Sequence, residues 1–190
     1  MKREFNMKIP TYFAISAVLA SCIGLSTTSA NADDDSGRRL RATLKGFNET
    51  PANSTSASGA FRAIINDDQT SITFELNYSE LVADSLFAHI HLGQKNVAGG
   101  VMIFFCDNST PSHSPRTCPA RGGTVTGTVT AEDVVGPDGQ GIAPGDFSKV
   151  IEAIRSGVTY VNVHSTKFPT GEIRGQVRVV GRHDDNKDDR

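Results

Sequence analysis

Short runs of alternating apolar and polar residues, separated by turn-forming residues, constrain the fold of this chain more than any other feature. In such runs every second side chain lies on one face of a β-strand. They occur at residues 40–44, 61–65, 72–78, 88–92, 123–129, 159–164 and 171–180, and a continuous apolar run occupies 101–105. The chain therefore predicts about eight short strands, with a hairpin where residues 66–69 separate two of the runs.

One segment has helical periodicity instead. Phe147, Val150, Ile151 and Ile154 follow the i, i+3, i+4, i+7 spacing, with Asp146 as the expected N-cap and Gly157 as the stop. Strands and helices do not alternate, and no glycine-rich phosphate loop opens a helix, so the sequence argues against nucleotide binding. We predict an all-β protein, an antiparallel β-sandwich with one short helix.

The N-terminal residues 1–32 have the features of a secretory signal peptide. Lys2, Arg3 and Lys8 precede an apolar segment, and Ala30-Asn31-Ala32 forms a small-residue cleavage site. The expected location is secreted or periplasmic. In the alternative interpretation, Leu19-Ala20-Ser21-Cys22 is a lipobox, and the protein is anchored through lipid on Cys22. No later segment is long and apolar enough to span a bilayer.

Charge is concentrated at the two ends of the expected mature chain. The full sequence has a net charge of −2, and loss of residues 1–32, which carry three basic side chains and one acidic, makes it more negative. We expect a flexible acidic N-terminus at 33–39, one domain at 40–180 and a disordered charged tail at 181–190. This mildly acidic balance argues against a nucleic-acid partner.

Two cysteines, Cys106 and Cys118, remain after removal of the leader. An even pair in an exported protein predicts a disulfide, here closing a loop rich in proline, serine and threonine.

Histidines are concentrated in two of the predicted strands. The segment AHIHLG places His89 and His91 on the face opposite Ala88 and Ile90, and YVNVHS places Asn162 and His164 on one face. If the two strands are neighbours or face each other, the three imidazoles converge. Three imidazoles are sufficient for a copper or zinc site.

The segments LKGFNETPANSTSASGAF (44–61), AHIHLG (88–93), GTVTGTVTAEDV (123–134) and SGVTYVNVHSTKFPTGEIRGQV (156–177) resemble the chordin-type, or CHRD, domain. The resemblance covers about residues 40–180 in one copy. It implies an extracellular β-sandwich module and no established enzyme activity. The cysteine-rich modules of chordin are missing, so growth-factor antagonism does not carry over, and the loop from Cys106 to Cys118 departs from the shared pattern.

The two histidine strands also resemble a reduced version of copper/zinc superoxide dismutase, which takes copper ligands from strands of this kind. The resemblance implies an immunoglobulin-like or superoxide-dismutase-like Greek key. A bridging histidine and a zinc cluster have no counterparts here. His113 is at most a distant fourth ligand, and Arg174 is the single candidate to guide an anion.

Three interpretations of the histidines stay open. They belong to an internal polar network with Asn162, Glu172 and Arg174; or they bind copper or zinc, with those three residues as supporting partners; or they act as acid/base groups without metal. No nucleophile motif or other catalytic residue is assigned. The first functional hypothesis is a non-enzymatic exported module that binds an unidentified protein or surface ligand, and the alternative is a periplasmic copper- or zinc-binding protein.

Overall fold

The computed structural model describes residues 37–181, so the predicted leader, Cys22 and most of the two acidic ends lie outside the described residues. The described residues all belong to one compact unit. Its strands are β1 (Arg39–Lys45), β2 (Ser58–Ile65), β3 (Ser71–Ser79), β4 (Ser85–Leu92), β5 (Gly100–Asp107), β6 (Gly123–Thr130), β7 (Thr159–Ser165), β8 (Ile173–Gln176) and β9 (Arg178–Val179). One α-helix, α1 (Phe147–Arg155), and three single 3₁₀ turns, Gly46–Asn48, Ala131–Asp133 and Asp138–Gln140, complete the described part. Among these residues no helix has the length and apolar character needed to cross a bilayer.

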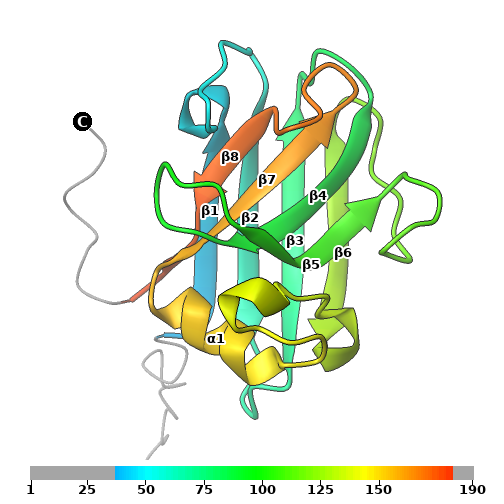
Figure 1. Ribbon diagram of the computed structural model, residues 1–190. Coiled ribbons are helices and arrows are strands. Elements are labelled where there is room, and N and C mark those ends of the chain that lie inside the picture. The colour runs from blue at the N-terminus through cyan, green and yellow to red at the C-terminus, as the bar shows by residue number, and fades with distance from the viewer. Residues whose placement is uncertain (1–36, 182–190) are drawn as a thin grey trace, which may run out of the picture. The chain divides into compact units, whose positions relative to one another are not determined.

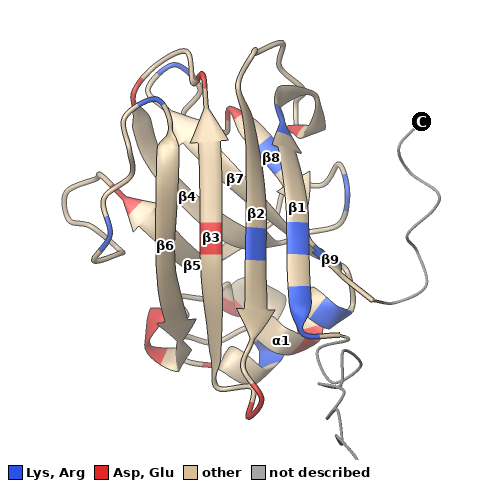
Figure 2. Ribbon diagram, turned by 180° about the vertical axis from the view of Figure 1, so that it is seen from behind, with Lys and Arg blue, Asp and Glu red and all other residues tan. Residues whose placement is uncertain are grey.

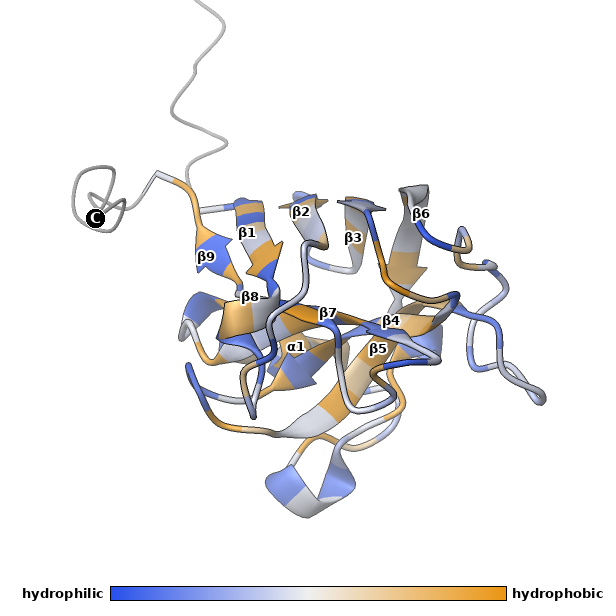
Figure 3. Ribbon diagram, turned by 90° about the horizontal axis from the view of Figure 1, so that it is seen from above, coloured by the Kyte–Doolittle hydropathy of each residue, from blue (hydrophilic) through white to orange (hydrophobic). Residues whose placement is uncertain are grey.

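The strands form one antiparallel sheet that folds over into two layers. The order is β5-β4-β7-β8-β1-β2-β3-β6, with β9 beside β1. Seen from above, β9, β1, β2, β3 and β6 form one layer, and β8, β7, β4 and β5 form the other (Figure 3). The two ends of the order, β5 and β6, contact each other, so the sandwich is nearly a closed barrel. The predicted all-β sandwich is confirmed.

Alternation explains the core between the layers. Phe61 on β2, Phe74 on β3 and Phe105 on β5 are almost fully buried, with ring centroids 4.5–6.5 Å apart. The hairpin from β2 to β3 is also confirmed, with Phe61 opposite Leu76. Burial of such aromatic side chains is the main stabilising contribution to a domain of this kind.

The predicted helix is confirmed at both ends. The Asp146 carboxylate accepts a hydrogen bond from the Lys149 backbone N–H, and Gly157 follows the C-cap with a φ of +72°. The helix lies at one end of the strands (Figure 1) and buries Val150 and Ile154 completely. Its amphipathic face therefore covers the end of the core between the two layers.

The prediction of one continuous strand at 171–180 is wrong. β8 pairs with β7, whereas β9 pairs only with β1, through Leu40 opposite Val179 and Arg41 opposite Arg178. Val177 separates them and donates its N–H to the Thr159 carbonyl. The segment crosses from one layer to the other where the sheet folds, and an alternating sequence does not indicate such a corner.

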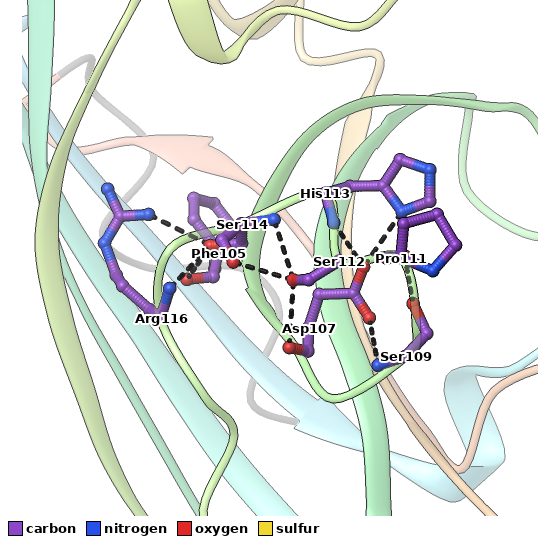
Figure 4. A network of polar contacts seen from close by, with 8 residues as sticks. All are labelled: Phe105, Asp107, Ser109, Pro111, Ser112, His113, Ser114 and Arg116. Atoms are coloured by element: carbon purple, nitrogen blue, oxygen red, sulfur yellow. Dashed lines mark hydrogen bonds and ion pairs between the residues drawn. The ribbon is translucent and has the colours of Figure 1, made fainter.

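The predicted disulfide joins Cys106, at the buried end of β5, to Cys118. The loop that it closes contains a polar network around the buried side chain of Asp107 (Figure 4). Burial raises the pKa of this carboxyl, but hydrogen bonds from Ser109 and His113 outweigh it and hold the pKa at about 2. The loop is therefore organised by one carboxylate as well as by the disulfide.

Replacing both cysteines by alanine is expected to lower the free energy of unfolding by about 3 kcal/mol, because the two residues are 12 positions apart and the unfolded chain regains the entropy of that loop. Urea unfolding of the variant and of the oxidised parent measures the difference. Reduction of the parent protein should cause a similar loss. Equal unfolding midpoints for the variant and the parent would contradict the prediction.

Candidate metal site

The two histidine-bearing strands are neighbours in the sheet. β4 and β7 pair antiparallel, with His89 opposite Asn162 and His91 opposite Tyr160. Ala88 and Ile90 face the core, so the histidines lie on the outer face of this layer. The two strands are therefore adjacent, as the convergence of the three imidazoles requires.

The imidazoles of His89, His91 and His164 lie together on this outer face. One ring nitrogen from each residue lies within 4.8 Å of those of the other two. The residues are only 3%, 7% and 6% exposed, respectively, although outer faces of sandwiches usually meet solvent. Loops cover this face and turn it into a second, smaller interior.

Backbone carbonyls fix the tautomers of two of the rings. His91 Nδ1 lies 2.8 Å from the Gly99 oxygen, and His164 Nδ1 lies 2.9 Å from the Pro169 oxygen. Because a carbonyl only accepts, each Nδ1 carries the proton and each Nε2 carries a lone pair. His164 Nε2 and His89 Nδ1 are buried and have no hydrogen-bond partner among the described residues. Buried ring nitrogens of this kind are uncommon without a ligand.

His91 Nε2 lies against the side chain of Asn162, with the amide 3.1 Å away. The proton of His91 is on Nδ1, so the amide NH₂ donates to Nε2, since two acceptors do not bond. Asn162 therefore donates a hydrogen bond to the lone pair of His91 Nε2, and a metal ion can replace this bond.

Aromatic rings surround the histidines. Tyr160 stacks on His91 with centroids 4.5 Å apart and planes 5° apart. Phe87 stacks on His89, and Phe104 meets His89 edge-on at 4.9 Å. An apolar shell of this kind limits water at the nitrogens and tunes a bound metal.

Arg174 positions one of these aromatic rings. Its guanidinium lies 3.3 Å from the Tyr160 ring centroid and donates to the carbonyls of Gln94 and Val97. The residue is 2% exposed. Arg174 therefore supports His91 through Tyr160 and fastens the loop after β4, and it is too buried to guide an anion from solvent.

The carboxyl of Glu49, which the sequence did not single out, is buried beside this group. Burial raises its pKa from 4.5 to about 7, against the opposing charge of Arg174. Gly171 permits this packing, because a Cβ there would lie 2.4 Å from Glu49 Oε1. The motif NETPAN contained the only sequence signal, an acidic residue inside a conformationally restricted loop.

Glu172 is fully buried, and its hydrogen bonds are made away from the three imidazoles. Its carboxylate accepts from Thr55 Oγ1 and the Val82 N–H on one oxygen, and from Ser165 Oγ on the other. These bonds join two loops to the end of β7. Glu172 thus supports the cover of the site rather than any histidine.

His113 is separated from the three imidazoles by an aromatic ring. It stacks on Phe104 with centroids 4.8 Å apart, and its Nδ1 is 2.9 Å from Asp107 Oδ2 (Figure 4). Its side chain is 54% exposed. The structure does not bring His113 together with the other three.

Burial keeps the three clustered histidines neutral at pH 7. Desolvation lowers the pKa of His164 to about 4 and lowers the pKa of His91. The pKa of His89 falls well below its ordinary value through desolvation and the two neighbouring imidazoles. Neutral imidazole is the form that binds metal, so no proton has to be removed at pH 7.

Comparisons with known proteins identify the family. The CHRD domain model matches residues 40–177. No curated protein and no solved structure matches the chain. The matched range contains β1 except its first residue, every strand from β2 to β8 and all three clustered histidines, and the chain belongs to the CHRD-domain family.

Proposed function

We propose that this chain is an exported CHRD module that binds one copper or zinc ion through His89, His91 and His164. Two observations carry the proposal: one ring nitrogen of each histidine lies within 4.8 Å of those of the other two, and His89 Nδ1 and His164 Nε2 are buried without a hydrogen-bond partner. Structural histidines in a metal-free network would satisfy each buried nitrogen.

The donor set limits the choice of metal. Three neutral imidazoles without a thiolate suit zinc and copper, whereas magnesium and calcium prefer oxygen ligands. Zinc–nitrogen bonds of about 2.0–2.1 Å bring tetrahedral neighbours to about 3.4 Å from one another. Ligand atoms within 4.8 Å therefore need small side-chain movements, and His91 must exchange its bond to Asn162.

Metal-binding histidines usually donate their other ring N–H to a carbonyl or carboxylate, and here the carbonyls of Gly99 and Pro169 accept that hydrogen bond. They hold the Nδ1 proton and orient the ring, which raises the basicity of Nε2. Binding is the activity proposed, and no catalytic residue is assigned with it.

The test uses residues 33–190, stripped with a chelator and titrated separately with Cu(II) and Zn(II). We expect one tightly bound equivalent of one of these metals. At about 100 times the dissociation constant the metal adds about 2.7 kcal/mol, which raises the melting temperature by about 5–10 °C.

His164→Ala is expected to weaken binding at least 100-fold, because it removes one of three ligands. His113→Ala is the matched control and should leave binding unchanged, since this histidine lies behind Phe104. Absence of any bound metal would sink the proposal. Equal binding by a variant with all three clustered histidines replaced would refute the assigned site.

A further inference from the structure

The strands that carry the three clustered histidines provide no carboxylate to balance a metal ion. β4 and β7 have no acidic or basic residue apart from histidine, and β8 beside β7 carries Arg174 as its one charged residue (Figure 2). The Tyr160 ring alone separates this guanidinium from His91. A dication held by neutral imidazoles would therefore lie in a buried space with another positive charge close by. Buried charge is costly unless an opposite charge is near, so a carboxylate from another segment favours binding.

Three carboxyl side chains are buried among the described residues, those of Glu49, Asp107 and Glu172. Asp107 accepts hydrogen bonds from Ser109 and His113 inside the disulfide loop, and both oxygens of Glu172 are also bonded. Glu49 Oε1 is buried and has no hydrogen-bond partner in this part of the chain. Glu49 is therefore the buried acid here with an oxygen still able to accept.

The loop that carries Glu49 is fastened on both sides of this residue. The Asn48 side chain donates to the Arg174 carbonyl at 3.1 Å, and the Asn53 side chain donates to the Glu172 carbonyl at 3.0 Å. Both acceptors belong to the segment that leads into and forms β8. The carboxyl is therefore held in place before any ion binds, which lowers the entropic cost of using it.

The Asn162 side chain links Glu49 to the histidines. Its amide is 3.1 Å from His91 Nε2 and also lies within hydrogen-bonding reach of the Glu49 carboxyl. When a metal ion takes the lone pair of His91 Nε2, the Asn162 N–H loses its acceptor. Asn162 is buried, so this N–H needs another acceptor, and Glu49 can provide one.

The charge balance around Glu49 also leaves room for a cation. Burial raises the pKa of this carboxyl to about 7, and Arg174 and Asn162 lower it only in part. One guanidinium therefore does not compensate the burial of the carboxylate. Further positive charge nearby, such as a bound dication, stabilises the ionised form.

We propose that Glu49 is the anionic partner of the metal site: it accepts the Asn162 N–H that a bound ion displaces from His91, and its negative charge offsets part of the charge of the ion. This inference rests on the proposed function, because it assigns a role within the same site. Glu49 is here a positioning residue, and the ligands remain the three histidines. Loss of such an outer partner typically weakens metal binding by about 10–100-fold.

Two substitutions of Glu49 separate its charge from its shape. Glu49→Gln keeps the volume and removes the charge, whereas Glu49→Asp keeps the charge and shortens the side chain. The chelator-stripped proteins are titrated separately with Zn(II) and Cu(II). We expect Glu49→Gln to weaken binding by about 10–100-fold and Glu49→Asp to weaken it less. Asp107→Asn is the matched control, because it replaces a buried carboxyl outside the site by an amide, and it should leave the affinity unchanged.

Two results would overturn the inference while the proposed function stands. One is a Glu49→Gln variant that binds metal as tightly as the parent protein. The other is weaker binding by Glu49→Asp than by Glu49→Gln, because shape would then matter more than charge. A parent protein that binds neither metal would refute the proposed function, and this inference with it.

A double-mutant cycle tests the link through Asn162. In the Asn162→Leu background the amide is missing, so a further change of Glu49 to glutamine should weaken metal binding less than it does in the parent protein. An equal loss of affinity in both backgrounds would show that Glu49 does not act through Asn162.

Discussion

Lowering the pH from about 7 to about 4.5 is expected to destabilise the metal-free domain. The clustered histidines have pKa values below those of an unfolded chain, and for His164 the pKa is about 4. Between that value and 6.5 the unfolded state binds more protons, so stability is lost as the pH falls. A shift of this size contributes about 3 kcal/mol for His164 alone.

Glu49 acts in the opposite direction over the same window. Its folded pKa of about 7 lies above 4.5, so the folded state binds more protons and gains stability as the pH falls through this range. The gain is also about 3 kcal/mol and cancels the loss at His164. The net loss comes from His89 and His91, whose pKa values are lowered as well.

Glu49→Gln tests this balance. Without the opposing carboxyl, the loss of stability between pH 7 and pH 4.5 should be larger by about 3 kcal/mol. Urea unfolding at both pH values, with chelator present, measures the change. A domain that is equally stable at both pH values, or a Glu49→Gln variant with the same acid loss as the parent, would contradict these pKa directions.

Replacing Glu172 by alanine is expected to lower the free energy of unfolding by about 3–5 kcal/mol, the second large effect. The residue is fully buried, and its carboxylate accepts hydrogen bonds from Thr55, Val82 and Ser165. The substitution leaves these donors without their acceptor and opens a cavity. Unsatisfied buried donors cost more than the bonds themselves contribute.

Two further variants define the cause of this effect. Glu172→Gln keeps the volume and one acceptor oxygen, so it should restore part of the stability. Glu75→Ala removes an exposed carboxylate on β3 and should change stability by no more than about 0.5 kcal/mol. If Glu172→Ala unfolds at the same denaturant concentration as Glu75→Ala, the buried carboxylate is not the link between the loops.

Prediction from sequence succeeded where the signal is local. Alternation gave the strands, the spacing of Phe147, Val150 and Ile154 gave α1, and the two cysteines gave the disulfide. It failed at 171–180, where one alternating run forms two strands on either side of Val177. The run crosses from one layer to the other at Val177. Apolar and polar residues alternate in the same way before and after this corner, so the alternation does not reveal it.

The sequence by itself determined that His89 and His91 share a face opposite Ala88 and Ile90, because side chains alternate along any strand. Only the tertiary structure decided that β4 and β7 are neighbours, which brings His164 to them. It also decided that the carbonyls of Gly99 and Pro169 fix the tautomers and that loops bury the outer face. These features depend on segments far apart in the chain, and no local pattern specifies which of them meet.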